Sequence, residues 1–422
     1  MVSPTLLIFI KHFILMRSSN MTNVAILGFG VVGGGVADLI TKNYKEVTAL
    51  GGDDINIKYI LDLRDFPDSP FADKVVHDFA VILKDNEVDS IIEVMGGSHP
   101  AYEYTVAALS AGKNVITSNK EVVANFGDEF MALAEKNGVS YRFEAAVGGG
   151  IPVISPIISC VKQNKITEVR GILNGTTNYI LTKMFSFGAS FEDSLKDAQE
   201  KGYAERNPDA DILGIDASRK IAILGALATG KLVPVDKIHT EGITAIRKED
   251  VEASAKVGLK IKLLGRCVIA DSGITIMVAP FMLSDSSALS GVSGVYNAVE
   301  VIGEPINSVM FYGPGAGAGP TASAVVGDLM QIMCSGTNCA KPTMVKTTEG
   351  ISDFDGFECA SYVAVSGGCP ASIKSAFGEV QFIETEGEYA FITAKMKESD
   401  ALAAIKALED KGATLKSRIR VL

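Results

Sequence analysis

Six residues, Gly28-Phe-Gly-Val-Val-Gly33, constrain the fold of this chain more than any others. They lie between an apolar run, Val24-Ala-Ile-Leu27, and a stretch of helical spacing from Val31 to Asn43. A GxGxxG motif in that position is typical of a dinucleotide-binding loop: its glycines allow a tight turn, close approach of the pyrophosphate and close packing of helix on strand. The helix N-terminus adds positive potential for the phosphates. We therefore predict that the cofactor contacts Gly28, Phe29, Gly30, Val31, Val32 and Gly33.

Beyond this loop, strand and helix patterns alternate along the chain. The strand patterns lie at 55–62, 90–95 and 114–117, and the helical patterns at 105–111 and 121–137. Such alternation builds a parallel sheet with helices on both faces. The predicted fold class is therefore α/β, with a Rossmann-type parallel-sheet domain over residues 21–150 that is completed by a helix at 321–332.

After Gly148-Gly-Gly-Ile-Pro152 the alternation stops. Long helical patterns at 191–199, 217–227 and 248–259 then mix with strand patterns such as 273–278. We expect an α+β catalytic and oligomerisation domain over residues 151–320, followed by a polar linker over 333–357. The last segment, 358–422, has the order strand, helix, strand, strand, helix, strand.

Composition restricts the environment and the partners of the protein. A chain of 422 residues is long enough for two or three domains. Its net charge of -11 repels phosphate backbones, so no nucleic-acid partner is expected. The six cysteines form no CxxC pair and are not clustered with the four histidines, which argues against zinc sites and disulfides. Free thiols and the lack of an export signal predict a cytoplasmic protein.

The first twenty residues contain apolar runs that superficially resemble a signal peptide. Lys11 and His12 interrupt these runs, whereas a membrane-spanning helix needs about twenty unbroken apolar residues. We expect residues 1–20 to be a non-structural extension that arises from a translation start placed one methionine too early. The folded chain would then begin at Met21, with no membrane partner.

The stretch from Ala198 to Lys220 concentrates charged side chains in a loop that contains glycine and proline. From Asp216 onward the spacing is helical, which places Asp216 and Lys220 on one face, one turn apart. The carboxylates of this stretch suit a substrate ammonium group, and the lysine suits an oxygen that gains or loses a proton during hydride transfer. A solvated acidic loop with an exposed Asp–Lys pair is the alternative. The apolar helix that follows favours a buried lysine.

Four motifs, in the expected order, resemble the homoserine dehydrogenase family. The stretch from Ala198 to Lys220 fits the signature of this family residue by residue, and Gly171-Ile-Leu-Asn-Gly-Thr-Thr-Asn-Tyr179 resembles its substrate-loop motif. Thr117-Ser-Asn-Lys120 is similar to its threonine/asparagine/lysine turn, and Glu144-Ala-Ala-Val-Gly-Gly-Gly-Ile-Pro152 to its monovalent-cation loop. The resemblance extends over nearly all of residues 23–332. It implies NAD(P)H-dependent interconversion of L-aspartate 4-semialdehyde and L-homoserine, in threonine, methionine and isoleucine biosynthesis.

The resemblance also implies roles for individual residues. Lys220 would donate and accept the proton, and Lys120 would be a second active-site lysine near the nicotinamide. The substrate would contact Glu205, Asp211, Asp216, Gly175 and Thr176. Besides the glycine loop, the cofactor would contact Arg64, Gly96, Lys120, Gly202 and Gly317.

The same resemblance implies a site for a monovalent cation, sodium in the first instance. The ion would be held by the Glu144 side chain and by the backbone carbonyls of Val147, Gly149 and Ile151. An all-oxygen donor set suits a hard cation. A glycine-rich hinge that holds no ion is the alternative.

Cofactor preference depends on two residues at the end of the second strand. Asp62 could hold a ribose hydroxyl, which favours NAD, although it lies further from the glycine loop than is usual. Arg64 could instead pair with a 2′-phosphate. We predict NADP, with NAD as the alternative.

The C-terminal segment resembles an ACT domain in its second half, at 390–396, 399–411 and 419–422. Its first half departs from that pattern, because Ser366-Gly-Gly-Cys-Pro370-Ala replaces the acidic residue and Pro-Gly that usually open the ligand loop. A threonine sensor and a dimerisation module without an effector both remain open. The family resemblance further implies a homodimer or homotetramer that acts on a small-molecule substrate.

Two other functions would fit parts of the sequence. An aldehyde-oxidising semialdehyde dehydrogenase would need a nucleophilic cysteine with a general base. Cys160 lies in an apolar run, Ile157-Ile-Ser-Cys-Val161, and we interpret it as a core residue. A non-enzymatic amino-acid or redox sensor would bind the cofactor without turnover. The combination of lysines and carboxylates favours the enzyme.

Overall fold

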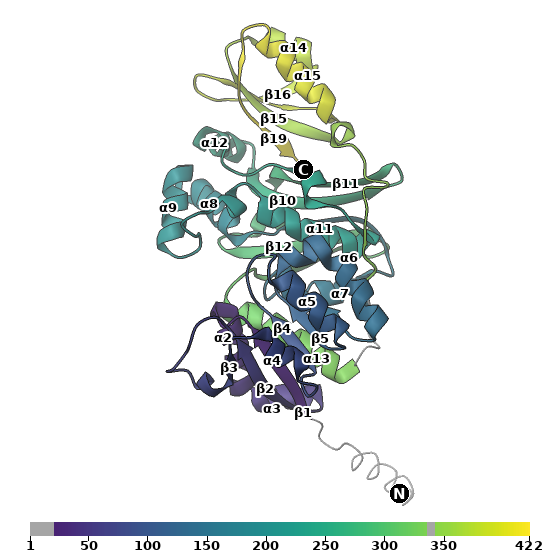
Figure 1. Cartoon of the computed structure of the whole chain (residues 1–422). Coiled ribbons are helices and arrows are strands. Elements are labelled where there is room, and N and C mark those ends of the chain that lie inside the picture. Colours follow the sequence, from purple (N-terminus) through teal and green to yellow (C-terminus); the bar gives the residue numbers. More distant parts are fainter. Residues whose placement is uncertain (1–20, 336–341) are drawn as a thin grey trace, which may run out of the picture. The chain divides into compact units, whose positions relative to one another are not determined.

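A computed structural model of the protein describes residues 21–335 and 342–422 (Figure 1). The expected extension over residues 1–20, a part of the expected linker and Cys339 lie outside the described residues. The described chain forms two compact units. The first contains residues 21–122, 129–145 and 317–335, and the second contains residues 123–128, 146–316 and 342–422.

The first unit is built on a parallel sheet with the strand order β3-β2-β1-β4-β5-β6. Its strands are β1 (Met21–Leu27), β2 (Asp54–Leu61), β3 (Val75–Val76), β4 (Ser90–Glu93), β5 (Asn114–Thr117) and β6 (Tyr141–Arg142). This is the strand order of a dinucleotide-binding Rossmann sheet, in which successive strands are added on one side of β1 up to β3 and on the other side from β4 onward. The predicted α/β class and parallel sheet are confirmed.

Helices cover the sheet of the first unit: α2 (Val31–Lys42), α3 (Tyr44–Gly51), α4 (Phe79–Lys84), α5 (Ala101–Ser110), α6 (Lys120–Asn137) and α13 (Ala318–Ser335), with the short turns η1 (Ala72–Lys74) and η2 (Glu144–Ala146). The helix predicted at 321–332 is present as α13 and packs on α2 in one apolar core. It is longer than predicted because Pro320 lies in its first turn, where a missing N–H costs nothing. At the crossing, a Cβ on Gly35 would lie 3.0 Å from the Ala318 carbonyl oxygen, so a side chain here would require a small shift of α13.

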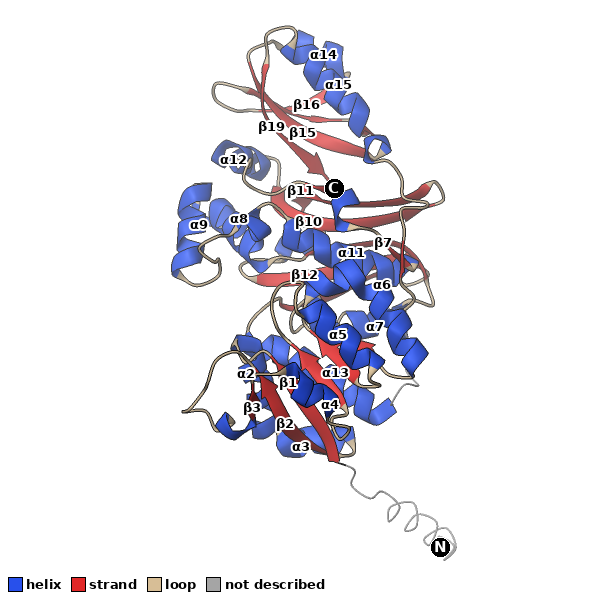
Figure 2. Ribbon diagram, in the orientation of Figure 1, coloured by secondary structure: helices blue, strands red, loops and turns tan. Residues whose placement is uncertain are grey.

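The second unit contains a sheet with the order β13-β12-β7-β10-β11-β19-β15-β17-β16. Strand β9 adds to β11 and β18 to β15. Figure 2 labels the strands from β12 to β15 that form the middle of this sheet. The strands of this unit are β7 (Lys165–Ile172), β8 (Lys231–Leu232), β9 (His239–Thr240), β10 (Leu259–Ala270), β11 (Gly273–Ser284), β12 (Tyr296–Glu304), β13 (Asn307–Pro314), β14 (Val345–Lys346), β15 (Glu358–Ser366), β16 (Val380–Ile383), β17 (Tyr389–Thr393), β18 (Met396–Lys397) and β19 (Thr414–Val421). Strand β14, from the expected linker region, pairs separately with β8.

The helices of the second unit are α7 (Ile154–Pro156), η3 (Ile157–Val161), α8 (Gly175–Phe187), α9 (Phe191–Glu200), α10 (Asp209–Ile212), α11 (Ile215–Thr229), η4 (Val235–Lys237), α12 (Lys248–Lys256), η5 (Ala288–Gly291), η6 (Phe354–Gly356), α14 (Pro370–Phe377) and α15 (Glu398–Glu409). Helix α11 is buried along most of its length against β10 and β11. Helix α12 is shorter than the predicted 248–259, because Gly258 has φ +71° and the chain then enters β10.

The C-terminal segment has the expected order β15-α14-β16-β17-α15-β19, with its own apolar core around Val363, Phe391 and Ile405. It does not form a separate sheet. The last strand, β19, pairs in parallel with β11, with Arg420 opposite Phe281 and Val421 opposite Met282, so the segment continues the central sheet (Figures 1 and 2).

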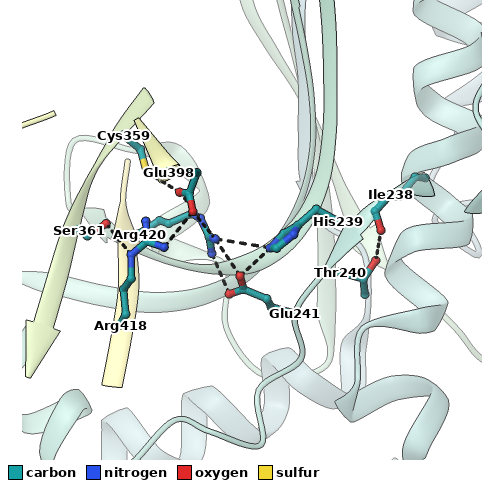
Figure 3. A network of polar contacts seen from close by, with 9 residues as sticks. All are labelled: Ile238, His239, Thr240, Glu241, Cys359, Ser361, Glu398, Arg418 and Arg420. Atoms are coloured by element: carbon teal, nitrogen blue, oxygen red, sulfur yellow. Dashed lines mark hydrogen bonds and ion pairs between the residues drawn. The ribbon is translucent and has the colours of Figure 1, made fainter. Parts of the chain in front are cut away.

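A group of ion pairs around the buried Arg420 and Glu398 lies where β19 joins β11, and we call it the junction network (Figure 3). Arg420, 2% exposed, donates to both carboxylate oxygens of Glu398 at 2.9 and 3.0 Å and to those of Glu241 at 2.7 and 2.8 Å. Arg418 also donates to Glu398, at 2.8 Å. Because Glu398 is itself only 1% exposed, its charge depends on these two arginines rather than on water.

No helix among the described residues is long and apolar enough to cross a membrane. The five described cysteines are free thiols. Cys267 and Cys359 are buried, as expected for small core residues, whereas Cys160, Cys334 and Cys369 are exposed.

Candidate active site

The geometry of the glycine loop agrees with dinucleotide binding at each of its three glycines. Gly28 has φ +95°, a conformation that disfavours a side chain. A Cβ on Gly33 would lie 2.0 Å from the Gly28 carbonyl oxygen, so the helix could not pack as it does. At Gly30, the N-cap of α2, a Cβ would meet nothing within 4 Å, which leaves the backbone open to a phosphate.

Asp62 and Arg64 hold this loop from the end of β2. Asp62 Oδ2 accepts a hydrogen bond from the Phe29 N–H at 2.8 Å, and Arg64 Nε donates to Asp62 Oδ1 at 2.9 Å. The Arg64 guanidinium holds the pKa of Asp62 far below its usual range. The unusual sequence spacing of Asp62 is thus explained, because the second helix α3 lengthens the connection without moving the end of β2 away from the loop.

Beside the loop lies a mainly apolar cavity of about 360 Å³ within the first unit. Its lining residues are Gly28, Leu61, Asp62, Leu63, Arg64, His77, Met95, Pro100 and Tyr104. We did not predict His77, whose Nδ1 lies 2.7 Å from the Asp62 carbonyl oxygen. An apolar cavity with a carboxylate and a guanidinium among its lining groups suits a nucleoside with its ribose.

Two further predicted residues of the first unit follow β4 and β5. Gly96 lies in the loop after β4, where a Cβ would meet nothing within 4 Å. Lys120 is the first residue of α6, directly after the N-cap Asn119. In a Rossmann sheet the ligand binds at the carboxyl ends of the strands, so both positions agree with a cofactor-side role.

In the second unit, Lys220 and Asp216 form a buried pair near the start of α11. Lys220 Nζ donates to Asp216 Oδ2 and to the Leu173 carbonyl oxygen, both at 2.7 Å. The two residues are 8% and 4% exposed. The alternative of an exposed surface pair is therefore wrong, and the prediction of a buried lysine at the start of an apolar helix is confirmed.

Asn174 joins this pair to a second carboxylate. Its Nδ2 lies 2.7 Å from Asp211 Oδ1 and 2.9 Å from Asp216 Oδ2, while its Oδ1 caps α8 by accepting from the Thr177 N–H. We did not predict Asn174 as a site residue. Its signal was present in the sequence, because an asparagine before Gly-Thr-Thr is a typical N-cap and helix N-termini often face ligands.

The remaining substrate residues are only partly brought together. Thr176 donates to the Tyr203 carbonyl oxygen at 2.6 Å, which fixes the loop after α9 against α8. Gly175 has no room for a side chain, since a Cβ would lie 2.7 Å from the Val295 carbonyl oxygen. Gly202 has φ +73° in an exposed turn, and the Glu205 side chain is exposed. In this respect Glu205 differs from Asp216 and Lys220, which are both buried.

The predicted cation loop spans the division between the two units. Glu144, 5% exposed, belongs to the first unit, and its N–H donates to Asp328 Oδ2 at 2.7 Å. Val147, Gly149 and Ile151 belong to the second unit and are buried. Gly149 has φ +56°, and its Cβ would lie 2.5 Å from the Gly315 carbonyl carbon. Gly317, at φ +118°, accepts a hydrogen bond from the Thr321 N–H at the start of α13.

The expectation that Cys160 lies in the core is wrong. Ile157 and Val161, one turn apart, occupy the buried face of η3 at 0% and 3% exposure, which turns Cys160 outward. Its thiol contacts the Ser159 hydroxyl at 3.3 Å, and no hydrogen bond to a general base is seen within the described chain. The geometry therefore offers no activated nucleophile for aldehyde oxidation at this cysteine.

A Rossmann sheet with a dinucleotide loop, together with a buried lysine–carboxylate pair, defines a nicotinamide-dependent oxidoreductase. Residues 28–144 match the NAD-binding domain of homoserine dehydrogenase, and residues 152–330 match the homoserine dehydrogenase domain itself. The chain belongs to the homoserine dehydrogenase family.

Individual relatives agree with this assignment. The homoserine dehydrogenase of Lactococcus lactis is 41% identical over 317 residues, 74% of each chain, and that of Bacillus subtilis is 39% identical over 74% of this chain and 72% of the relative. The crystal structure of a homoserine dehydrogenase from Thiobacillus denitrificans covers 96% of this chain and 98% of its own, at 33% identity and a TM-score of 0.89. A hyperthermophilic archaeal homoserine dehydrogenase in complex with NADPH covers 74% of this chain and 97% of its own, at 27% identity and a TM-score of 0.63.

Proposed function

We propose that Lys220 is the acid and base of the homoserine dehydrogenase reaction, the interconversion of L-aspartate 4-semialdehyde and L-homoserine. The observation that carries this proposal is the buried Lys220, fixed by Asp216 and by the Leu173 carbonyl at 2.7 Å each. Lys220 Nζ is the donor in both contacts, and a positioned donor is what the transfer of a proton to the substrate needs. The two contacts also fix the direction of the side chain.

The proton and the hydride reach different atoms of the aldehyde. The bound nicotinamide cofactor supplies the hydride to the aldehyde carbon. Lys220 gives its proton to the aldehyde oxygen as negative charge grows there, which produces the hydroxyl group of homoserine. In the reverse direction Lys220 accepts that proton. Lys120, at the start of α6, would be the second lysine on the cofactor side.

Asp211 and Asp216 would bind the ammonium group of the substrate, with Glu205 at the exposed side. Asn174 Nδ2 donates a hydrogen bond to each of the two carboxylates. These bonds hold the two like charges close together despite their repulsion. Gly175 and Thr176, at the N-terminus of α8, would face the substrate carboxylate with the positive end of that helix.

Replacing Asp211 by asparagine is expected to raise the KM for L-homoserine about tenfold or more, since a hydrogen bond between charged groups contributes about 1.5–3 kcal/mol. The KM for 4-hydroxybutanoate, which lacks the amino group, should not change. Asp209→Asn, an exposed carboxylate of the same short helix, is the matched control and should leave both values unchanged. An equal rise for both substrates would contradict a role in ammonium recognition.

NADP is the proposed cofactor, with Arg64 as the residue that meets the 2′-phosphate at the rim of the cavity. The glycine loop, Gly96, Lys120, Gly202 and Gly317 would complete the contacts. The fit is supported by the open backbone at Gly30 and by the exposed Arg64 side chain. An NADPH-bound relative also supports the proposal.

The Arg64→Ala variant should have a KM for NADPH about tenfold higher and a smaller rise in the KM for NADH. A charged hydrogen bond of about 1.5–3 kcal/mol is lost only with the phosphorylated cofactor, whereas the contact of Arg64 with Asp62 is lost with both. Steady-state kinetics with both cofactors measures this ratio, and Arg64→Lys, which keeps the charge, should recover part of it. If NADH and NADPH respond alike, the 2′-phosphate is bound elsewhere.

A monovalent cation, sodium in the first instance, is proposed at Glu144, Val147, Gly149 and Ile151. The chemistry of the donors supports it, since one carboxylate and three carbonyl oxygens suit a hard ion. The ion would stabilise the loop that begins at η2. Within the described residues, no group of three or more His, Cys, Asp or Glu side chains gathers as a metal site.

A homodimer or homotetramer is proposed from the edges of the central sheet. Strand β13 is an edge strand on which Met310 and Tyr312 are 38% and 53% exposed, and Tyr312 stacks on the exposed Tyr296. Exposed edges of this kind are commonly covered in native proteins. The cytoplasmic location and the ACT-like character of residues 358–422 stay predictions, supported by the free thiols and by the βαββαβ order respectively.

A further inference from the structure

Glu93 is a fully buried carboxyl group that the proposed chemistry does not use. It is the last residue of β4, the strand next to β1, and its exposure is 0%. The switch in strand order lies between β1 and β4, and in sheets of this type the dinucleotide binds just beyond the carboxyl ends of the strands there. A buried carboxylate at this place requires hydrogen-bonding partners.

Those partners lie on the two segments that follow β4 and β5. Glu93 Oε1 accepts from the Met95 N–H at 2.8 Å, and Glu93 Oε2 accepts from the Thr117 hydroxyl at 2.5 Å. Thr117 Oγ1 in turn accepts from the Asn119 N–H at 2.9 Å. Asn119 Nδ2 returns to the first segment by donating to the Gly97 carbonyl oxygen at 2.7 Å. We call these five residues the Glu93 circuit.

The circuit fixes the two segments that contain Gly96 and Lys120, the 95–97 loop and the 117–120 turn. Gly96 lies between Met95 and Gly97, both of which are circuit members. Asn119 is the N-cap of α6, with Oδ1 3.2 Å from the Glu121 N and 3.4 Å from the Val122 N, so its position sets where Lys120 begins the helix. Any shift of Thr117 or Asn119 would move Lys120.

The two hydrogen bonds of Glu93 need an acceptor at each of its side-chain oxygens, which a carboxylate provides. Thr117 has a single hydroxyl hydrogen, which it donates to Glu93, and its oxygen is already an acceptor for Asn119. A glutamine in the same side-chain conformation could accept the hydrogen bond from the Met95 N–H only if its NH₂ group pointed toward Thr117. The threonine hydroxyl would then lose its acceptor inside the protein, which is costly for a buried group.

We propose that Glu93 is a positioning residue for the hydride-transfer site: its carboxylate fixes the 95–97 loop and the 117–120 turn, and thereby Gly96 and Lys120. This inference depends on the proposed roles of Gly96 and Lys120 at the cofactor.

Acid pH should weaken the circuit. Burial raises the pKa of Glu93 to about 7, against the hydrogen bonds from Thr117, Met95 and Asn119, which lower it. The titratable group that faces it from β6 is Tyr141, whose pKa burial and Glu93 both raise, so that Tyr141 stays neutral. Because Glu93 is an acid with a raised pKa, it is ionised above about pH 7 and becomes neutral below it. Activity should therefore fall on the acid side of that value.

The test compares Glu93→Gln with Thr117→Val and Thr117→Ser in the full chain. We expect Glu93→Gln and Thr117→Val each to lower kcat about 10- to 100-fold, since a displacement of about 1 Å can cost that much. Thr117→Ser, which keeps the hydroxyl, should be close to wild type. The loss of kcat in the double variant Glu93→Gln/Thr117→Val should be smaller than the product of the two single losses, because both changes remove the same hydrogen bond between Thr117 and Glu93. The acid limb of the kcat profile should be absent in Glu93→Gln.

A second measurement, made without cofactor, is amide hydrogen exchange over residues 95–98 and 117–122. Exchange should be faster in Glu93→Gln and Thr117→Val than in wild type and Thr117→Ser. Wild-type kcat, pH profile and exchange in Glu93→Gln would overturn the proposal, as would loss of folding stability with unchanged kcat. Lys220→Ala separates this result from the proposed function: an inactive Lys220→Ala beside a fully active Glu93→Gln refutes only the role of Glu93.

Discussion

Replacing Lys220 by alanine is expected to lower kcat for L-aspartate 4-semialdehyde reduction about 10³-fold, since one general acid or base contributes on the order of 10²–10⁴. Lys220 is buried at 8% exposure between Asp216 and the Leu173 carbonyl. NADPH binding, measured by its fluorescence, should be unchanged, because the dinucleotide loop belongs to the first unit and Lys220 to the second.

Two controls make this result specific. Lys237→Ala removes an exposed lysine of the same unit and should leave kcat unchanged. Lys220→Arg keeps the charge but cannot give up a proton at ordinary pH, so it should be nearly as inactive as the alanine variant. A Lys220→Ala enzyme with wild-type kcat would remove this residue from the chemistry and leave Lys120 as the candidate.

Replacing Glu398 by alanine is expected to destabilise the C-terminal segment by about 3–5 kcal/mol, the range for removing one partner of a buried ion pair. Glu398 is the shared acceptor of Arg418 and Arg420 in the junction network (Figure 3). Without it, Arg418 would lose this ion pair and Arg420 would keep only its ion pair with Glu241. Because β19 pairs with β11, loss of this contact should loosen the C-terminal strand from the central sheet.

Urea unfolding and limited proteolysis of the 358–422 segment measure this effect. Glu409→Ala, an exposed carboxylate on the same helix, is the matched control and should change stability by no more than about 0.5 kcal/mol. Equal behaviour of the two variants would show that the junction network does not hold the segment in place.

Acid should act on the same network. Burial alone would raise the pKa of Glu241, but hydrogen bonds from His239 and Arg420 outweigh it and lower that pKa to about 2. Burial opposes ionisation of Glu398 as well, yet hydrogen bonds from Arg420 and Arg418 leave its pKa lowered. An acid with a lowered pKa stabilises the fold above its ordinary value of 4.5 and loses that effect as the pH falls toward its folded value. The segment should therefore become protease-sensitive between about pH 4.5 and 2.

The sequence predicted best what depends on neighbours along the chain. The glycine loop, the Rossmann strands and the Asp216–Lys220 pair are local patterns of turn, burial and one helical turn. The parallel sheet could be predicted because alternating strands and helices can pack around one core in only a few architectures. Even the order of elements in the C-terminal segment could be predicted in this way.

The features that could not be predicted from the sequence depend on contacts between distant parts of the chain. Asn174 reaches Asp216 across 42 residues, and Asp62 reaches Phe29 across 33 because α3 lengthens the connection. Glu93 had no local signal, because a glutamate in an apolar run does not reveal that Thr117 and Met95 will meet it. The pairing of β19 with β11 was likewise not predictable, because the hydrophobic periodicity of a strand does not say which strand lies beside it.

The assignment of the chemistry is tested most directly by incubating the wild-type protein with L-aspartate 4-semialdehyde and NADPH and identifying the product. We predict that NADPH is consumed in equal amount to the L-homoserine formed, and that the reaction runs backward with L-homoserine and NADP. NADPH that binds but is not oxidised, or an oxidised acid as the product, would contradict the account.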